Sequence, residues 1–384
     1  MKSKYDICFV GLKCYDLLSN APVPRYLGGI EKQLVALART LIKEQFKVAF
    51  ITYDHGQPTR TIHGGIPVYK SFSPDEGMPG LRFIHPRMTK LWSAMRKADA
   101  SIYVQMGAGS ETGSVAIGSS WFLHGKRSFV FCTASDSDCD KQLPVLDALR
   151  ERVLYRYGLR HAYRVITQTQ SQRIMLSDSF GIASAVIPMP FSDEDAMPMP
   201  AVSGGLAQVN ENSVLWVGRI CKEKRFEWLL DLAERCPEMI FNVVGTANQE
   251  SKYTKQMQER ASRIKNVCLH GRISEERLQA LYLESKILCC TSLLEGFPTT
   301  FLEAWSMGIP IVTSFDPDGV IAAEGLGSVK YTLDGLEESL HGLIESPDEW
   351  EKASKSARQY YLDHHSAEAA GKNFGLIFSE VLGA

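Results

Sequence analysis

Short apolar runs recur along the chain, and most are separated by segments long enough to form a helix. In the first half these runs occupy residues 5–11, 47–53, 66–72, 101–106, 127–133, 164–169 and 185–188. Apolar runs that alternate with helix-length segments are typical of parallel sheets, because helices cover both faces of such a sheet. The pattern therefore predicts an α/β protein with a doubly wound parallel sheet.

A polar segment at residues 192–212 interrupts this alternation. It combines three acidic residues with a stretch rich in proline and glycine, which favours a linker. Strand-like runs then resume at residues 213–218, 239–245, 267–271, 286–291 and 309–314. A chain of 384 residues is also longer than one hydrophobic core usually supports. We expect two Rossmann-like domains, residues 1–192 and 193–365, which face each other across a cleft lined by the loops that follow strands.

The composition is that of a folded globular protein, with 45% hydrophobic and 22% charged residues. No apolar run approaches the roughly 18 residues that span a bilayer, and the first run is too short for a signal peptide. We therefore expect a cytoplasmic protein. The nine cysteines show no C-x-x-C spacing, which favours reduced, packed thiols over disulfides or zinc.

The net charge of −2 is unevenly distributed along the chain. Residues 1–200 contain 24 Lys and Arg against 18 Asp and Glu, and the remainder contains 18 against 26. A basic first half suits an anionic acceptor or a membrane surface. Arg152, Arg156 and Arg160 recur at intervals of four on a predicted helix, so one face of it could contact the phosphates of a lipid or lipid-linked acceptor. An exposed helix with ordinary charges is the alternative.

Two glycines, Gly28 and Gly29, follow the first predicted strand and open a helix that we expect to run to about residue 44. Glycines allow the backbone to approach a ligand closely. The start of a helix also offers free amide groups and a positive dipole end to a phosphate. A simple turn before a helix is the alternative.

A second candidate phosphate site follows the first strand of the second domain. Arg219 comes directly after that strand, and Lys224 lies deeper in the loop. Fixed cations near a helix start would stabilise a departing nucleotide diphosphate, because its leaving oxygen gains negative charge. For the neighbouring Lys222 and Arg225 we expect only a solvated basic turn.

The most specific pattern is a pair of acids, Glu295 and Glu303, on either side of a predicted helix start. Pro298 is favoured at the first position of a helix, which would place Glu303 in its second turn. Carboxylates accept hydrogen bonds from paired hydroxyl groups, so one acid could bind a sugar and the other a ribose. The residues between the two acids could approach phosphate oxygens through their backbone. They are Gly296, Phe297, Pro298 and Thr299, and all but the proline have an N–H group to donate. This helix is apolar nearly all round, so we expect Glu303 to be buried with a polar partner.

Together these elements resemble the family-four retaining glycosyltransferases of the GT-B fold. The resemblance rests on Gly28-Gly29-Ile30-Glu31, on the element from Gly218 to Lys224, and on the Glu295 to Glu303 spacing with Gly-Phe-Pro between. It extends over nearly the whole chain and is closer in the second half than in the first.

The resemblance implies roles for these residues. Glu303 would bind the ribose of the donor, Glu295 the transferred hexose, and Arg219 with Lys224 the diphosphate, while Gly29 would lie near the phosphates. The family retains the anomeric configuration and needs neither metal nor cofactor. It also implies that a C-terminal helix at about residues 366–384 returns to an acceptor-binding first domain.

One position departs from the family pattern. Many relatives have a His-Asp pair after the strand that matches residues 127–133, whereas this chain has Ser135 and Asp136. We expect these two residues to take over the orientation of the sugar. The acidic residues at 136, 138 and 140 could also be taken for a D-x-D metal site, although a loop that lines the acceptor site is the favoured interpretation.

The leading hypothesis is a hexosyltransferase of polysaccharide or glycoconjugate biosynthesis, which uses a nucleotide diphosphate sugar and a glycan, lipid-linked or small-molecule acceptor. We expect no nucleic-acid partner. A nucleotide-sugar epimerase or hydrolase on the same fold and a non-catalytic sugar-binding protein are the alternatives. The sequence leaves the base, the donor sugar and the acceptor open, and peripheral contact with the inner face of a membrane is a further option.

Overall fold

The computed structural model describes residues 3–21, 25–26, 28–78, 82–123, 127–191, 210–247, 251–293 and 295–383. The chain forms two compact units, one of residues 1–193 and 365–384, the other of residues 194–364. Most of the predicted linker, residues 192–209, lies outside the described residues, and its last three residues belong to a strand. Among the helices described, none is both long and apolar enough to cross a bilayer.

The first unit contains an eight-stranded sheet with the order β3-β4-β2-β1-β5-β6-β7-β8. Its strands are β1 (Tyr5–Val10), β2 (Val48–Thr52), β3 (Arg60–His63), β4 (Ile66–Lys70), β5 (Ala100–Met106), β6 (Ser128–Cys132), β7 (Arg164–Thr167) and β8 (Ala185–Val186). All neighbouring pairs are parallel except the β3–β4 hairpin at the edge. The parallel sheet that the apolar runs predicted is confirmed.

The hairpin strand β3 was not predicted. Its side chains alternate between exposed and half-buried positions, so it has no apolar run. The turn to β4 consists of Gly64 and Gly65, which both have positive φ, at 53° and 81°. Two such residues form the tight turn that joins antiparallel strands, and glycine adopts this conformation without strain.

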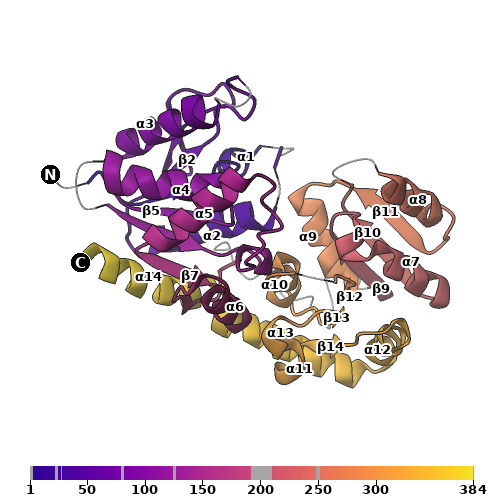
Figure 1. The fold of residues 1–384 in the computed structure, drawn as a ribbon. Helices are drawn as coiled ribbons and strands as arrows, with labels where there is room; N and C mark the ends of the chain where they lie inside the picture. The colour runs from indigo at the N-terminus through magenta and orange to yellow at the C-terminus, as the bar shows by residue number, and fades with distance from the viewer. Residues whose placement is uncertain are drawn as a thin grey trace. The chain divides into compact units, whose positions relative to one another are not determined.

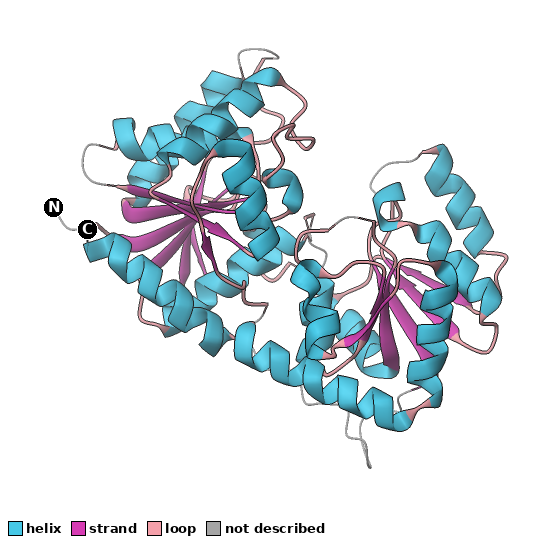
Figure 2. Ribbon diagram, turned by 60° about the horizontal axis from the view of Figure 1, so that its bottom comes forward, coloured by secondary structure: helices cyan, strands magenta, loops and turns pink. Residues whose placement is uncertain are grey.

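Helices cover both faces of the first sheet (Figure 2). Helices α2 (Gly29–Lys43) and α14 (Ala367–Gly383) share one core cluster with the sheet, through residues such as Leu37, Leu41, Phe374 and Phe378. Helices α3 (Thr89–Ala98), α4 (Ser110–Ile117), α5 (Leu149–His161) and α6 (Gln170–Phe180) contribute to a second cluster on the other face. The C-terminal helix α14, yellow in Figure 1, therefore belongs to the first unit, beside a helix from the start of the chain.

The second unit contains a six-stranded parallel sheet with the order β11-β10-β9-β12-β13-β14. Its strands are β9 (Asn210–Val217), β10 (Ile240–Val244), β11 (Val267–Gly271), β12 (Ser285–Cys290), β13 (Ile311–Thr313) and β14 (Gly327–Val329). The helices that accompany them are α7 (Phe226–Arg235), α8 (Lys252–Ala261), α9 (Glu275–Glu284), α10 (Thr299–Ser306), α11 (Val320–Glu324), α12 (Leu333–Glu345) and α13 (Pro347–His364). The doubly wound α/β class is thus confirmed for both halves. In each unit the carboxyl ends of parallel strands meet at one edge of the sheet, where ligands of such folds bind.

Candidate functional site

In the second unit, the loop after β9 meets the loop after β12. Lys224 ends a short 3-10 turn and forms an ion pair with Glu295, and both side chains are mostly shielded from solvent. The structure therefore brings Lys224 and Glu295 together at the carboxyl edge of the sheet, and Arg219 lies exposed in the same loop as Lys224.

The prediction that Arg225 belongs to a solvated turn was wrong. Its guanidinium group donates hydrogen bonds to the carbonyl oxygens of Thr291 at 2.9 Å and Ser292 at 3.1 Å, and to Ser314 Oγ at 2.9 Å. It also stacks on Trp228, 4.0 Å from the ring centroid. Arg225 thus ties the loop after β9 to the ends of β12 and β13, because its planar fork of donors matches acceptors that converge from separate strands.

Glu295 and Glu303 occupy different environments. Helix α10 begins at Thr299 with Pro298 as its N-cap, one residue later than predicted, and Phe297 and Pro298 are buried. The first amide groups of any helix have no partner within it, so this end presents donors beside Glu295. Glu295 is half-buried in the loop, whereas Glu303 lies inside the helix with 3% of its surface exposed.

The buried carboxylate of Glu303 has a polar partner, as we expected from the sequence. Tyr282 of α9 donates a hydrogen bond from its hydroxyl to Glu303 Oε2 at 2.6 Å. Burial and the nearby carboxylate raise the pKa of Tyr282 well above its ordinary value, so the phenol remains a donor at neutral pH. Sequence reasoning missed Tyr282, because a tyrosine on the apolar face of a helix is indistinguishable from a core residue.

In the first unit, the start of α2 lies against the ends of β5 and β6. Gly28 is the N-cap of α2 and Gly29 its first residue. At Gly107, after β5, φ is +80°, and an added Cβ would lie 3.1 Å from Ile30 Cδ1 and 3.4 Å from Ala134 Cβ. The glycine loop and the segment that contains Ser135 and Asp136 are therefore close neighbours.

A chain of buried polar side chains positions Asp136. Gln172 donates to Asp136 Oδ1 at 3.1 Å and accepts from Thr133 Oγ1 at 2.7 Å and from the backbone N–H of Gln168 at 3.0 Å. Gln168 in turn donates to the carbonyl oxygen of Thr133 at 2.9 Å. Neither glutamine was singled out from the sequence, since their role depends on the contact between α6 and the end of β6.

The middle acid of the run after β6, Asp138, is held by backbone groups. Asp138 is buried and accepts hydrogen bonds from the N–H groups of Ala108, Ala134 and Ser135, at 3.1, 2.6 and 3.1 Å. Burial raises the pKa of Asp138 although these hydrogen bonds oppose the rise. Its carboxylate therefore holds the two strand-end loops together.

Arg152, Arg156 and Arg160 of α5 do not form one exposed basic face. Arg152 donates to the carbonyl oxygen of Leu146 at 2.8 Å, and Arg156 to that of Lys141 at 2.9 Å. Only Arg160 of these three is exposed. Two of the guanidinium groups thus anchor the preceding loop, which the spacing of four could not reveal.

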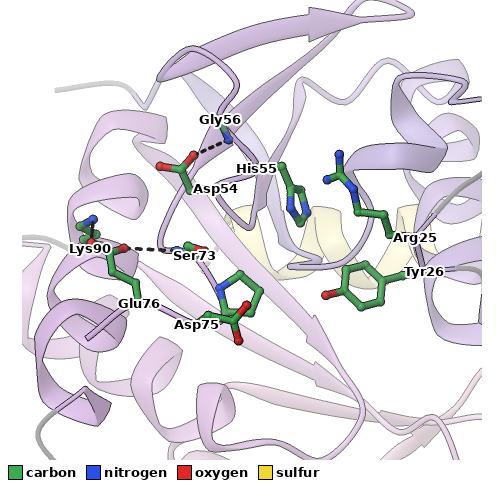
Figure 3. A pocket seen from close by; sticks show the side chains of 10 residues that line it. Arg25, Tyr26, Asp54, His55, Gly56, Ser73, Asp75, Glu76 and Lys90 are labelled. Carbon is green, nitrogen blue, oxygen red and sulfur yellow. Dashed lines mark hydrogen bonds and ion pairs between the residues drawn. The ribbon is translucent and has the colours of Figure 1, made fainter. Parts of the chain in front are cut away.

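A polar cavity of about 600 Å³ lies in the first unit, beside the carboxyl ends of β2 and β4 (Figure 3). It is lined by Arg25, Tyr26, Asp54, His55, Gly56, Ser73, Pro74, Asp75, Glu76 and Lys90. Sequence reasoning selected none of these residues. The available signal was their position after predicted strands, which is where ligands bind in this fold class.

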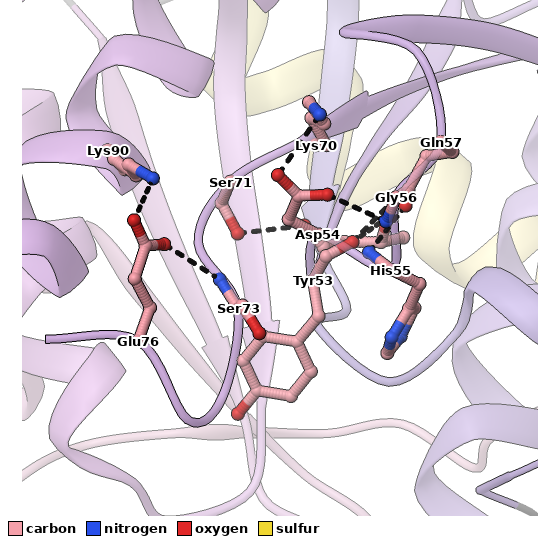
Figure 4. Close-up of polar contacts among 11 residues, drawn as sticks. Tyr53, Asp54, His55, Gly56, Gln57, Lys70, Ser71, Ser73, Glu76 and Lys90 are labelled. Carbon is pink, nitrogen blue, oxygen red and sulfur yellow. Dashed lines mark hydrogen bonds and ion pairs between the residues drawn. The ribbon is translucent and has the colours of Figure 1, made fainter.

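Most charges in this cavity are already paired (Figure 4). Asp54 forms an ion pair with Lys70 at 3.0 Å and accepts from the N–H of Gly56 at 2.9 Å, and Glu76 forms an ion pair with Lys90. Burial opposes ionisation of Asp54, but the two partners outweigh it and lower the pKa of the carboxyl. The cavity therefore does not collect the unpaired positive charge that a phosphate would need.

His55 projects into the cavity opposite Tyr26 and Arg25 (Figure 3). Burial, reinforced by Arg25, lowers the pKa of His55, so the imidazole is neutral at pH 7. Its Nε2 atom is buried and has no hydrogen-bond partner among the described residues. A neutral imidazole, a phenol and the exposed carboxylate of Asp75 are groups that bind hydroxyl groups.

Comparison with known protein families matches residues 204–374 to the family described as Glycosyl transferases group 1. This segment contains the loops after β9 and β12 and the whole of α10. Over these residues the chain is similar to the glycosyl transferases group 1. The resemblance inferred from the motifs is thereby confirmed.

Two curated glycosyltransferase relatives match part of the chain. The GtfA subunit of UDP-N-acetylglucosamine–peptide N-acetylglucosaminyltransferase from Streptococcus parasanguinis is 26% identical over 174 residues, 41% of this chain and 32% of that protein. Mannosylfructose-phosphate synthase from Agrobacterium fabrum is 26% identical over 184 residues, 43% of this chain and 40% of that protein. The matched region thus spans well under half the length of these relatives.

Solved structures of glycosyltransferases match the whole chain. Sucrose-phosphate synthase from Thermosynechococcus elongatus has a TM-score of 0.77 at 16% identity and covers 99% of this chain and 100% of its own. HepE of Anabaena, in complex with UDP and glucose, has a TM-score of 0.73 at 17% identity, with 98% and 99% covered. The fold is therefore the GT-B fold of glycosyltransferases.

Proposed function

We propose that this protein is a retaining glycosyltransferase that transfers a hexosyl unit from a nucleotide diphosphate sugar to a hydroxyl group of an acceptor, without a metal ion or cofactor. The observation that carries the proposal is the convergence of Lys224, Glu295 and the start of α10, near the buried Glu303, in the part of the chain that matches the family. The bound UDP and glucose of HepE, a protein with the same fold, agree with this donor class.

Each residue of this site has a role in the proposed reaction. Arg219 and Lys224 bind the diphosphate, assisted by the amides of Gly296, Phe297 and Thr299 at the start of α10. When the bond to the sugar breaks, negative charge grows on the leaving oxygen, and fixed cations stabilise it without a metal. Glu303 binds the ribose hydroxyls, and Tyr282 holds its carboxylate in one orientation.

The ion pair between Lys224 and Glu295 has a consequence for donor binding. A diphosphate that approaches Lys224 competes with Glu295 for the ammonium group, so Glu295 becomes available to the hydroxyls of the hexose.

Anomeric retention follows if the acceptor attacks from the face that the diphosphate leaves, and its hydroxyl proton passes to the leaving phosphate oxygen. Gly28 and Gly29 supply a close backbone approach, and Ser135 and Asp136 orient the sugar.

The acceptor binds to the first unit in this proposal. The cavity beside β2 and β4 offers the neutral imidazole of His55, the ring of Tyr26 and the carboxylate of Asp75, and its cations Arg25 and Lys90 are paired with acids. Stacking and neutral donors suit an uncharged sugar or glycan end better than a phosphate. A peripheral membrane contact through Arg160 and the basic first half stays a prediction, since Arg152 and Arg156 have structural partners.

The test begins with donor binding. Nucleotides and nucleotide sugars are added in the presence of EDTA, and the unfolding midpoint is measured for the wild type, for Glu303→Gln and for Glu349→Gln, an exposed control on α13. A ligand at a hundred times its Kd adds about 2.7 kcal/mol of stability. We expect one base to stabilise the wild type and the control but not Glu303→Gln.

Product analysis then separates the reactions. The selected donor is incubated with a panel of sugars, glycans and lipid-linked sugars, and the anomer of each product is determined by NMR. An α-linked product from an α-linked donor supports the proposal. A new free sugar or an epimerised donor without acceptor would indicate a hydrolase or an epimerase, and binding without turnover would indicate a non-catalytic protein.

A further inference from the structure

A cluster of metal-ligating side chains lies where α7 ends and passes α12. Cys236 directly follows α7, Glu238 lies in the turn that leads to β10, and Glu337 and His341 are one turn apart on α12. The ligand atoms of Cys236, Glu337 and His341 all lie within 4.8 Å of one another. Cys236 is fully buried, whereas His341 is about one-third exposed.

The distance between the thiol and the imidazole in this cluster matches that in a tetrahedral metal site. Cys236 Sγ lies 3.7 Å from His341 Nε2, and Glu238 Oε1 lies 3.6 Å from the same nitrogen. Around a tetrahedral zinc ion, bond lengths of about 2.3 Å to sulfur and 2.0–2.1 Å to nitrogen place sulfur and nitrogen about 3.6 Å apart. An ion would therefore fit between the thiol and the imidazole, and the Glu238 carboxylate, which is outside the group of mutually close ligand atoms, would move toward it.

The orientation of His341 supports a metal ligand. Its Nε2 atom faces Cys236 and Glu238, while its Nδ1 atom lies 3.2 Å from Glu345 Oε1 on the same helix. Metal-binding histidines usually donate their second ring N–H to a carboxylate, which fixes the tautomer and the ring. An ordinary surface ion pair would explain the carboxylates around His341, but it would not require a buried thiol at Nε2.

We propose that Cys236, Glu337 and His341 form a binding site for one Zn²⁺ ion, and that Glu238, 3.6 Å from His341 Nε2, turns toward it as the fourth ligand. Thiolate, imidazole and carboxylate are all zinc ligands, and on binding the thiol of Cys236 releases its proton to solvent. The cluster lies at the amino end of β10, whereas Lys224 and Glu295 follow the carboxyl ends of β9 and β12. Within the second unit, the ion thus has a structural role that joins α7 to α12 and takes no part in the transfer reaction.

Cobalt serves as the spectroscopic probe, because Co²⁺ occupies zinc sites and gives a thiolate charge-transfer band and intense visible bands when tetrahedral. The metal-free full-length protein is titrated with Co²⁺ and then with Zn²⁺. We expect one equivalent of Co²⁺ to produce the bands and one equivalent of Zn²⁺ to abolish them. No donor or acceptor is needed, so the result is independent of the proposed function.

Variants locate the ion. His341→Gln keeps a polar side chain at this partly exposed position and should lose the bands while remaining folded, and Cys236→Ser should lose the thiolate band. His270→Gln and Cys268→Ser, the control histidine and the exposed control cysteine of the same unit, should bind like the wild type. Zn²⁺ at a hundred times its Kd should raise the unfolding midpoint by about 5–10 °C in the wild type and in both controls, but not in His341→Gln. Absence of the bands, or bands that persist in His341→Gln, would overturn the proposal.

Discussion

The hydrogen bond between Tyr282 and Glu303 provides a sharp test of how the donor site is built. The substitution Tyr282→Phe removes one oxygen atom and keeps the ring in the core. Glu303 Oε2 then loses a donor at 2.6 Å in a region from which water is excluded. The effect should appear in both stability and nucleotide affinity, because the same carboxylate is the proposed ribose ligand.

The size of the effect follows from the charge of the acceptor. A hydrogen bond to a charged group contributes about 1.5–3 kcal/mol, and a buried acceptor that loses its donor incurs a desolvation cost of similar size. We expect the free energy of unfolding to fall by about 1.5–3 kcal/mol. If the carboxylate also loses its orientation, nucleotide affinity should fall by about tenfold, which corresponds to roughly 1.4 kcal/mol.

The pH dependence supplies a second signature of this bond. The pKa of Tyr282 is raised in the folded protein, so its contribution is fully present below the ordinary tyrosine pKa of about 10 and is lost as the pH rises above it. Above about pH 10 the unfolded chain loses this proton and the folded protein does not. The stability difference between wild type and Tyr282→Phe should therefore shrink by up to about 1.4 kcal/mol per pH unit.

The assay is urea denaturation from pH 7 to 11, combined with calorimetry of nucleotide binding at pH 7. Tyr331→Phe is the matched control, since Tyr331 is 72% exposed in the same unit. A double-mutant cycle with Glu303→Gln isolates the pairwise contribution. If Tyr282→Phe changed stability no more than the control and left nucleotide affinity intact, Tyr282 would have no positioning role and the reasoning would be refuted.

Three further predictions concern other contacts. Lys224→Met should lower nucleoside diphosphate affinity by about tenfold or more and leave nucleoside affinity unchanged in calorimetry, whereas Lys222→Met, at an exposed position, should change neither affinity. Arg225→Lys should lower the free energy of unfolding by about 2–3 kcal/mol in urea, because lysine cannot reproduce the forked contacts to Thr291 and Ser292; an unchanged midpoint would contradict this. Tyr26→Ala should raise the acceptor KM with donor affinity unchanged, and an unchanged KM would exclude the cavity as acceptor site.

The strands of the fold were largely predictable from local pattern. Buried parallel strands have apolar side chains on both faces, so they appear as continuous apolar runs, as in β12, which is buried throughout. The strands β3 and β14 were not predicted, for the opposite reason. Both are short, and their side chains are half-buried or exposed, so neither has an apolar signal.

The candidate site was predictable only where its chemistry is local in sequence. Glu295 and Glu303 are eight positions apart around a helix start, so their spacing alone indicated a donor site. Arg225 was misjudged because its acceptors lie 66, 67 and 89 residues away. The same applies to the cavity near His55, which loops from separate strands assemble.

The sequence by itself therefore determined the class of the fold and indicated the candidate strand-ending loops and the family resemblance, since periodicity and short motifs are properties of neighbouring residues. Only the tertiary structure decided which side chains meet. It paired Lys224 with Glu295, gave Glu303 its phenol donor and gathered Cys236 with His341 across 105 positions. These contacts depend on how strands and helices pack, and packing joins residues whose separation along the chain carries no pattern.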